Sequence, residues 1–204
     1  MRRNRWTAAL TGAGAVLLAG CGSPDGEAGP AIGETSAAGE AASASRAVLR
    51  NAEGAEVGTV LFSEVSAGTE VVAEMQGLEP GFYGFHVHGT GLCEPDSAAP
   101  DDPASTGDFL SAGGHLGADA GEHPEHAGDL PSLYVTENGE GLLMVVTDRF
   151  GVDELTAGSG SAVLIHSGPD NFANVPERYA QGGPDEATRR TGDAGSRLAC
   201  GVVE

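Results

Sequence analysis

From residue 46 onward the chain consists of short apolar runs separated by turn signals, and this spacing most constrains its fold. Leu142, Met144 and Val146 alternate with the residues between them, as in a strand with two different faces. No helical period persists beyond a single turn expected at Val152–Leu155. We expect strands at Ala47–Asn51, Val57–Val65, Thr69–Met75, Phe82–His88, Ser132–Thr136, Gly141–Thr147, Ala162–His166 and Arg197–Val203. The pattern predicts an all-β sandwich or barrel.

Two long connections interrupt this series of strands. The first, Gly89–Pro131, is rich in Gly, Pro, Asp and His, and the second, Ser167–Ser196, has few apolar residues. Loops of this length in a compact domain are usually functional or disordered. Because these loops hold or adjoin all six histidines, we expect a metal site there.

The N-terminal residues have the composition of an export signal. Three arginines precede a short apolar stretch, Ala8–Gly20, which ends in Leu18-Ala19-Gly20-Cys21 and resembles the bacterial lipobox. We therefore expect a lipoprotein signal peptide at 1–20, an acylated Cys21 with a flexible tether at 21–45, and one domain at 46–204. The alternative is an uncleaved anchor helix. Either way, the domain is predicted to lie outside the cytoplasm, tethered to the membrane.

Charge and cysteine content narrow the function classes. The formal net charge of −20 excludes a nucleic-acid backbone as partner. Of the three cysteines, lipidation would consume Cys21. The remaining pair, Cys93 and Cys200, could form one disulfide in an oxidising compartment. Two buried free thiols are the alternative.

The histidine spacing is compatible with metal binding. His86 and His88 are two apart in an expected strand, so both imidazoles leave the same face. The next long loop carries three more imidazoles and a carboxylate, which is the ligand count of a closed tetrahedral zinc site. Exposed polar positions on a strand and a solvated acidic loop would give the same spacing, so both alternatives stay open.

Four segments resemble the copper/zinc superoxide dismutases in their exported bacterial form. They are residues 84–88 (Gly-Phe-His-Val-His), 113–115 (Gly-Gly-His), 126–130 (His-Ala-Gly-Asp-Leu) and 192–203, which ends in a Cys-Gly-Val-Val run. The resemblance covers residues 46–204 and implies a Greek-key β-barrel of eight strands. It also implies dismutation of superoxide to oxygen and hydrogen peroxide by a histidine-bound copper, with zinc as the structural and electrostatic partner.

The resemblance further implies a role for each motif residue. The implied copper ligands are His86, His88, His115 and His166. The implied zinc ligands are His115, His123, His126 and Asp129. His115 would bridge the two metals and carry a proton, and Arg197 would guide the anion. Asp170 would orient a copper-ligand and a zinc-ligand histidine, and Cys93–Cys200 would be the family's disulfide.

Two departures from the family pattern leave alternatives open. Only two residues, one of them Pro124, separate His123 from His126, where the family has a longer insert, so a copper-only protein is the alternative to a two-metal one. The stretch from His88 to Cys93 is short in a loop that many relatives use for dimer contact; a homodimer is possible. A copper store on the same barrel and an adhesion-like lipoprotein are the competing functions.

Overall fold

The computed structural model describes residues 44–204, and its main element is a nine-stranded antiparallel sheet. Its strand order is β4-β8-β9-β3-β2-β1-β11-β10-β5. The strands are β1 (Ala44–Asn51), β2 (Glu56–Val65), β3 (Gly68–Gln76), β4 (Gly81–Tyr83), β5 (Phe85–His88), β8 (Leu133–Val135), β9 (Glu140–Thr147), β10 (Ala162–His166) and β11 (Arg197–Val202). β3 pairs with β9 and not with β4, the next strand in the chain, which lies two strands beyond β9. A long connection of this kind, from β3 to β4, is typical of a Greek key.

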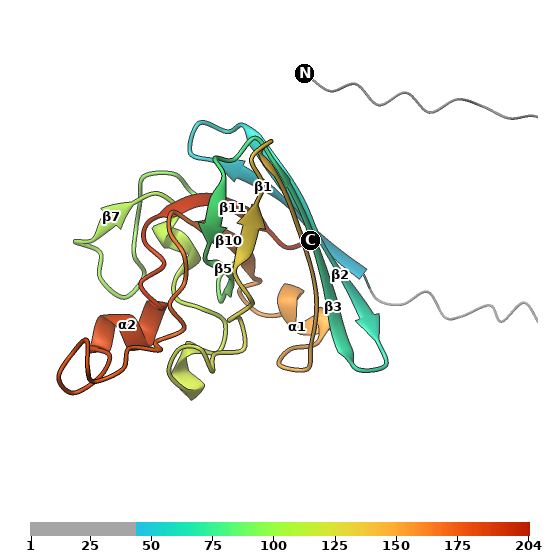
Figure 1. Cartoon of the computed structure of the whole chain (residues 1–204). Helices are drawn as coiled ribbons and strands as arrows, with labels where there is room; N and C mark the ends of the chain where they lie inside the picture. Colours follow the sequence, from blue (N-terminus) through green and yellow to red (C-terminus); the bar gives the residue numbers. More distant parts are fainter. Residues whose placement is uncertain (1–43) are drawn as a thin grey trace, which may run out of the picture. The chain divides into compact units, whose positions relative to one another are not determined.

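The sheet is curled into a nearly closed barrel (Figure 1). Its edge strands, β4 and β5, follow one another in the chain and are joined by the single residue Gly84. The predicted eight-strand barrel is confirmed, but its fourth strand is divided in two. At the division, Gly84 N–H donates to Gly168 O at 2.8 Å, and a Cβ on Gly84 would lie 2.5 Å from Ala194 Cβ. Close contact with the second long loop therefore favours glycine at this corner.

The core fills the inside of the barrel. Fully buried side chains from strands on both sides meet there, among them Leu49, Phe62, Phe85, Leu133 and Ile165. The alternation predicted for β9 is confirmed, since its even-numbered residues 142–146 are exposed and the odd-numbered ones partly buried against the core. This packing gives the loops a rigid base.

The two long loops carry short elements of their own. The first holds a small ribbon, β6 (Ser97–Ala98) and β7 (Thr106–Gly107), and two 3₁₀ turns, η1 (Leu110–Ala112) and η2 (Ala118–Ala120). The second holds α2 (Glu186–Thr191), which was not predicted from the sequence. Between β9 and β10, α1 (Val152–Thr156) is the expected single turn. α2 begins where the Asp185 carboxylate accepts the Thr188 N–H, and it ends at Gly192, whose φ of 61° suits glycine. In Figure 1 the two loops lie on the side of β5 and β10 away from β2 and β3.

A disulfide joins Cys93 to Cys200, with Cα atoms 5.5 Å apart and a sequence separation of 107. This confirms the predicted pairing and attaches the first long loop to β11. No helix within residues 44–204 has the length and hydropathy needed to cross a membrane. The predicted signal peptide, Cys21 and all but the last two residues of the tether lie outside the described residues.

Candidate metal centre

Backbone pairing on both sides of β5 brings the histidines together. On one side β5 pairs with β10, with His86 opposite Leu164. On the other side the first long loop forms isolated bridges, placing His88 opposite His115 and His86 opposite Asp129. Gly128 makes this approach possible, because a Cβ there would lie 2.1 Å from Val87 O.

The first group of imidazoles consists of His86, His88, His115 and His166. One ligand atom from each lies within 4.8 Å of the others, and all four side chains are buried. His88 Nδ1 donates to Gly113 O at 2.8 Å, which leaves the lone pair of Nε2 facing His166 Nε2 at 3.4 Å. His86 Nδ1 is buried and makes no hydrogen bond within the described residues. Unpaired buried nitrogens that converge in this way suit a metal ion.

The second group surrounds the carboxylate of Asp129. The Nδ1 atoms of His115, His123 and His126 lie 2.6, 3.0 and 3.1 Å from its oxygens. Around a tetrahedral zinc with bonds of about 2.0–2.1 Å, neighbouring ligand atoms are about 3.3 Å apart, close to these separations. His86, which belongs to the first group, also has a ligand atom within 4.8 Å of those of His115, His123 and Asp129, whereas no bond joins His86 to the Asp129 carboxylate among the contacts of residues 44–204. Three imidazoles and one carboxylate therefore form the second donor set.

Asp170 connects the two groups from behind. Its Oδ2 lies 2.8 Å from His86 Nε2 and its Oδ1 lies 2.9 Å from His123 Nε2. The carboxylate is fully buried and also accepts the Phe172 N–H at 2.7 Å. By accepting the Nε2 protons it directs both Nδ1 lone pairs toward the two donor sets, as carboxylates behind metal ligands do. Asp170 thus lies behind one histidine of each group.

Burial keeps three imidazoles of the first group neutral, those of His88, His115 and His166. It lowers the pKa of His88 well below the usual range, with a further contribution from the His115 charge. Burial also lowers the pKa of His115 to about 4 and that of His166 to about 3, in the latter case helped by His86. Neutral imidazoles have lone pairs free for a cation at neutral pH.

The carboxylates behave in the opposite way. Burial raises the pKa of Asp129 and of Asp170, but hydrogen bonds from the histidines outweigh it and lower both below the usual range. Burial lowers the pKa of His123, yet its bonds to Asp129 and Asp170 raise it to about 9. Two ionised carboxylates thus supply negative charge next to the second donor set.

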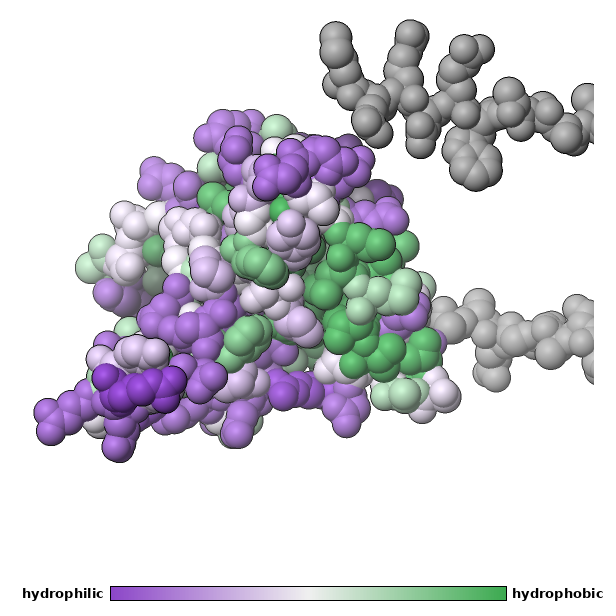
Figure 2. Space-filling model, viewed as in Figure 1, coloured by the Kyte–Doolittle hydropathy of each residue, from purple (hydrophilic) through white to green (hydrophobic). Residues whose placement is uncertain are grey.

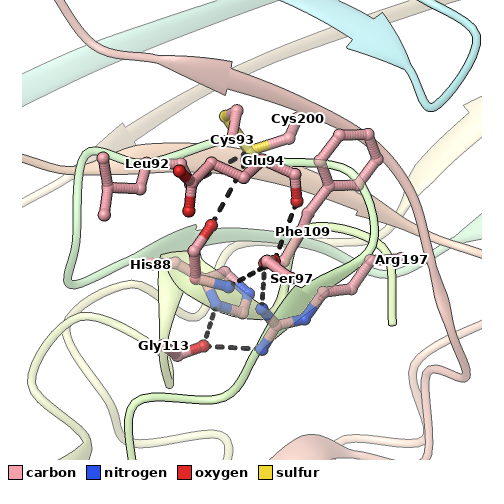
Figure 3. The surroundings of a disulfide bond; sticks show 10 residues. His88, Leu92, Cys93, Glu94, Ser97, Phe109, Gly113, Arg197 and Cys200 are labelled. Atoms are coloured by element: carbon pink, nitrogen blue, oxygen red, sulfur yellow. Dashed lines mark hydrogen bonds between the residues drawn. A yellow bond between two sulfur atoms is a disulfide. The ribbon is translucent and has the colours of Figure 1, made fainter. Parts of the chain in front are cut away.

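Arg197 lies at the start of β11, close to the first group. It lines a cleft of about 790 Å³ together with His88, His115 and His166. Its Nη1 and Nη2 donate to Phe109 O at 2.5 Å and Gly113 O at 2.6 Å. Figure 3 shows this guanidinium beneath the Cys93–Cys200 disulfide, sharing Gly113 with His88. Burial lowers the pKa of Arg197 to about 10, so the side chain stays positively charged at neutral pH.

Every metal-site residue predicted from the sequence lies in one of the two groups, between them, or in the cleft. No role was predicted from the sequence for Gly192 or Phe172. A Cβ on Gly192 would lie 2.0 Å from Asp170 Oδ1, and the Phe172 ring stacks on His123 at 6.3 Å. The one available signal for Phe172 was its place two residues after an aspartate, where Asx turns form.

A family model described as copper/zinc superoxide dismutase matches residues 56–203. The chain belongs to the copper/zinc superoxide dismutase family. It is 43% identical over 202 residues to a copper/zinc superoxide dismutase of Mycolicibacterium paratuberculosis, covering 95% of this chain and 86% of that protein. An Escherichia coli superoxide dismutase is 35% identical over 158 residues, covering 74% and 80% of the two chains. The solved Cu/Zn superoxide dismutase of Brucella abortus superposes with a TM-score of 0.60 at 30% identity, covering 79% of this chain and all of that one.

The family uses copper and zinc, and the two donor sets have the right chemistry for both ions. Imidazole nitrogens suit Cu(II) and Zn(II), and a carboxylate is a regular zinc ligand. Within residues 44–204 no thiolate competes at either set, because Cys93 and Cys200 are joined to each other. His86 Nδ1 is buried and makes no hydrogen bond among the described residues, and His123 Nδ1 lies 3.0 Å from an Asp129 oxygen, so each nitrogen lies beside the other donors of its set.

Proposed function

We propose that the first imidazole group holds copper, that the second holds zinc, and that the protein thereby dismutes superoxide to oxygen and hydrogen peroxide. The observation that carries this proposal is the position of His115. Its ring belongs to both groups, with Nδ1 on the Asp129 side and His88 on its other side at a centroid distance of 4.9 Å. A single imidazole between two donor sets can serve one ion with each ring nitrogen.

A copper ion held by His86, His88, His115 and His166 would supply the one-electron chemistry by which one superoxide is oxidised to oxygen and a second is reduced. The protein's own residues carry the proton and orient the imidazoles. His115 Nε2 takes up a proton in the reduced half of the cycle and donates it to the second superoxide, and solvent supplies the other proton of hydrogen peroxide. His88 keeps its orientation throughout because Nδ1 stays bonded to Gly113 O. Buried His86 is oriented in the same way by Asp170.

Arg197 provides the positive charge that attracts the anionic substrate. The guanidinium has five N–H groups, and the two carbonyl bonds leave others free to face the cleft. Superoxide dismutases are themselves a known case of electrostatic steering, in which local charge in a cleft outweighs net charge. This matters here because the whole chain carries a formal charge of −20.

Superoxide consumption by the copper- and zinc-loaded protein tests the proposal. We expect Arg197→Ala to lower kcat/KM about tenfold and to weaken its dependence on ionic strength. Arg178→Ala is the matched control. Arg178 lies in the second long loop, which ends just before Arg197, but its guanidinium stacks on the Tyr179 ring, with Cζ 4.7 Å from the ring centroid. An Arg197→Ala efficiency within twofold of wild type would refute the role of Arg197. Tight copper binding without any superoxide consumption would instead favour a copper store.

The protein is further proposed to act outside the cytoplasm, attached to the membrane through acylated Cys21. Two features of the sequence support this location. The apolar stretch Ala8–Gly20 follows three arginines, as in an export signal, and it ends in the lipobox-like run Leu18-Ala19-Gly20-Cys21. Expression in a bacterial host followed by mass spectrometry of the N-terminus tests it. We expect a diacylated or triacylated Cys21 in the membrane fraction, and release of Cys21→Ser from that fraction. An unmodified Cys21 in a soluble protein would refute the anchor.

A homodimer is proposed through the outer face of β2, β3, β9, β8 and β4. Leu142 and Met144 on this face are 68% and 65% exposed, and Phe82 packs on Tyr134 at a centroid distance of 4.9 Å. Figure 2 shows a continuous apolar area on one side of the barrel. Monomers rarely expose apolar patches of this kind, and a twofold dimer needs one self-complementary patch. Because the chain is acidic, an anionic lipid surface would repel it.

Light scattering on the purified protein tests the dimer. Wild type should have twice the mass of the monomer, and Met144→Glu should shift it to the monomer. Tyr179→Ala is the control, since Tyr179 is 76% exposed in the second long loop rather than on the barrel face. A monomeric wild type at micromolar concentration would refute the proposal.

A further inference from the structure

We infer that Arg149 is a positioning residue that holds the zinc-ligand segment from outside the metal site. Its Nη1 donates to two main-chain carbonyls, Pro124 O at 2.7 Å and His126 O at 3.1 Å. These carbonyls belong to the short stretch that contains His123 and His126. One guanidinium thus fixes the backbone between and beside two ligands of the second group. The inference rests on the proposed assignment of zinc to that group.

Arg149 can act as a fixed support because the chain on both sides of it is anchored. Its own N–H donates to Thr147 Oγ1 at 3.2 Å, at the end of β9. The next residue, Phe150, is buried and packs edge-on against Phe62, with ring centroids 6.3 Å apart. Phe150 O also accepts the buried hydroxyl of Thr69 at 2.8 Å. A side chain projecting from such a turn can hold a loop with little freedom of its own.

The zinc-ligand segment needs support of this kind. His123 is attached through its N–H to Arg189 O at 2.7 Å, and Gly128 is attached to Leu116 of the same loop and to Val87 of β5. Between these two attachments, residues 124–127 belong to no strand or helix. Arg149 contacts this interval from the β9 side, so three separate parts of the fold fix the segment. The short His123–His126 spacing, which departs from the family pattern, is the part that Arg149 holds.

The loss of a residue that supports only the zinc ligands should affect zinc binding and leave copper binding unchanged. Arg149 contacts the carbonyls of the second group's segment, whereas the strand-borne His86, His88 and His166 are held by β5 and β10. Loss of Arg149 should therefore speed zinc release and leave the copper site unchanged. Outer residues that orient metal ligands typically change metal affinity 10–100-fold.

The experiment uses the full chain, demetallated and then reloaded with Cu(II) and Zn(II), or with Co(II) in place of zinc. Zinc release to an excess of a chromophoric chelator is measured for wild type, Arg149→Ala, Arg149→Lys and Arg50→Ala. Arg50 is the matched control, an exposed arginine whose Nη1 donates to one main-chain carbonyl, Gly54 O. We expect release about tenfold faster for Arg149→Ala, partial rescue by Arg149→Lys, and no change for Arg50→Ala. The Co(II) visible spectrum should change in Arg149→Ala while the Cu(II) spectrum does not.

Three outcomes overturn the inference. Zinc release from Arg149→Ala within twofold of wild type would show that the carbonyl contacts do not position the ligands. Equal loss of zinc and copper, with a lower melting temperature of the metal-free protein, would show a general packing role. A wild type that takes up neither Zn(II) nor Co(II) would overturn the zinc assignment itself and the inference with it.

Discussion

The two metal-ligand groups differ in how the fold carries them. In the first group, His86 and His88 lie on β5 and His166 ends β10, two strands paired in register. In the second group, His123 and Asp129 lie in the first long loop, outside every strand and helix. Three of the four ligands of the first group are thus built into the barrel, with His115 of the first long loop as the fourth, whereas the second group is assembled by contacts between loops.

This difference determines which substitutions should disturb each group. A strand ligand is held by a ladder of hydrogen bonds shared with many residues, so few distant changes can displace it. The loop ligands depend on individual contacts, such as the Asp170 carboxylate behind His123 and the Gly128 approach to β5. We therefore expect the copper group to be sensitive mainly to its own ligands, and the zinc group also to residues that bind no metal.

The largest expected effect comes from removing a strand ligand. His166→Gln takes away one of the four imidazoles of the copper group while keeping a side chain of similar size. We expect dismutation to fall at least about a hundredfold, more than the loss typical of an outer residue, because a direct ligand is missing. Zinc content, measured by elemental analysis, should stay near wild type. Loss of zinc along with copper would contradict the separation of the two groups.

The strand-borne half of the site could be predicted from local sequence. Alternating apolar residues placed β9, and the predicted range Ala162–His166 is the observed β10. Period-two geometry put His86 and His88 on one face, and the structure confirms that Phe85 and Val87 point into the core. The roles of single residues were predicted from the family resemblance, by matching each family motif to a segment of this chain.

The contacts between loops could not be predicted in this way. α2 has six residues, too few for a helical period to show, and its end at Gly192 matters only because Asp170 lies against it. Arg149 is exposed and sits in a turn after β9, so nothing in its neighbourhood marks it as a partner of Pro124. Such pairs are set by the tertiary fold, which brings together segments that local patterns treat separately.

The next largest effect is expected from removing the carboxylate at the centre of the second group. Asp129→Ala deletes the carboxylate that three imidazole nitrogens approach within 3.1 Å. We expect zinc affinity, measured by competition with a chelator, to fall about a hundredfold, because a direct ligand and the common partner of the others are both lost. Copper binding should change only a few-fold, since three of its four ligands lie on strands. A comparable loss of copper would mean that the strands alone do not hold the first group.

The smallest expected effect sharpens the comparison, because it changes a residue that binds no metal at all. Gly192 and Gly158 have nearly the same backbone, with φ of 61° and 59°, so alanine at either position costs about 1–2 kcal/mol in left-handed strain. Their surroundings differ: a Cβ at Gly158 meets nothing within 4 Å, whereas one at Gly192 would lie 2.0 Å from Asp170 Oδ1 and 2.6 Å from His123 Nε2.

Gly192→Ala should therefore displace the carboxylate that orients His123 and speed zinc release about tenfold, while Gly158→Ala lowers the melting temperature without changing zinc release. Copper is the internal control, but not a trivial one, because Asp170 also bonds His86. If β5 fixes the His86 ring as firmly as its pairing suggests, the Cu(II) spectrum of Gly192→Ala will match wild type. If that spectrum changes as much as zinc release does, Asp170 rather than the strand positions His86, and the contrast between strand-borne and loop-borne ligands fails at that residue.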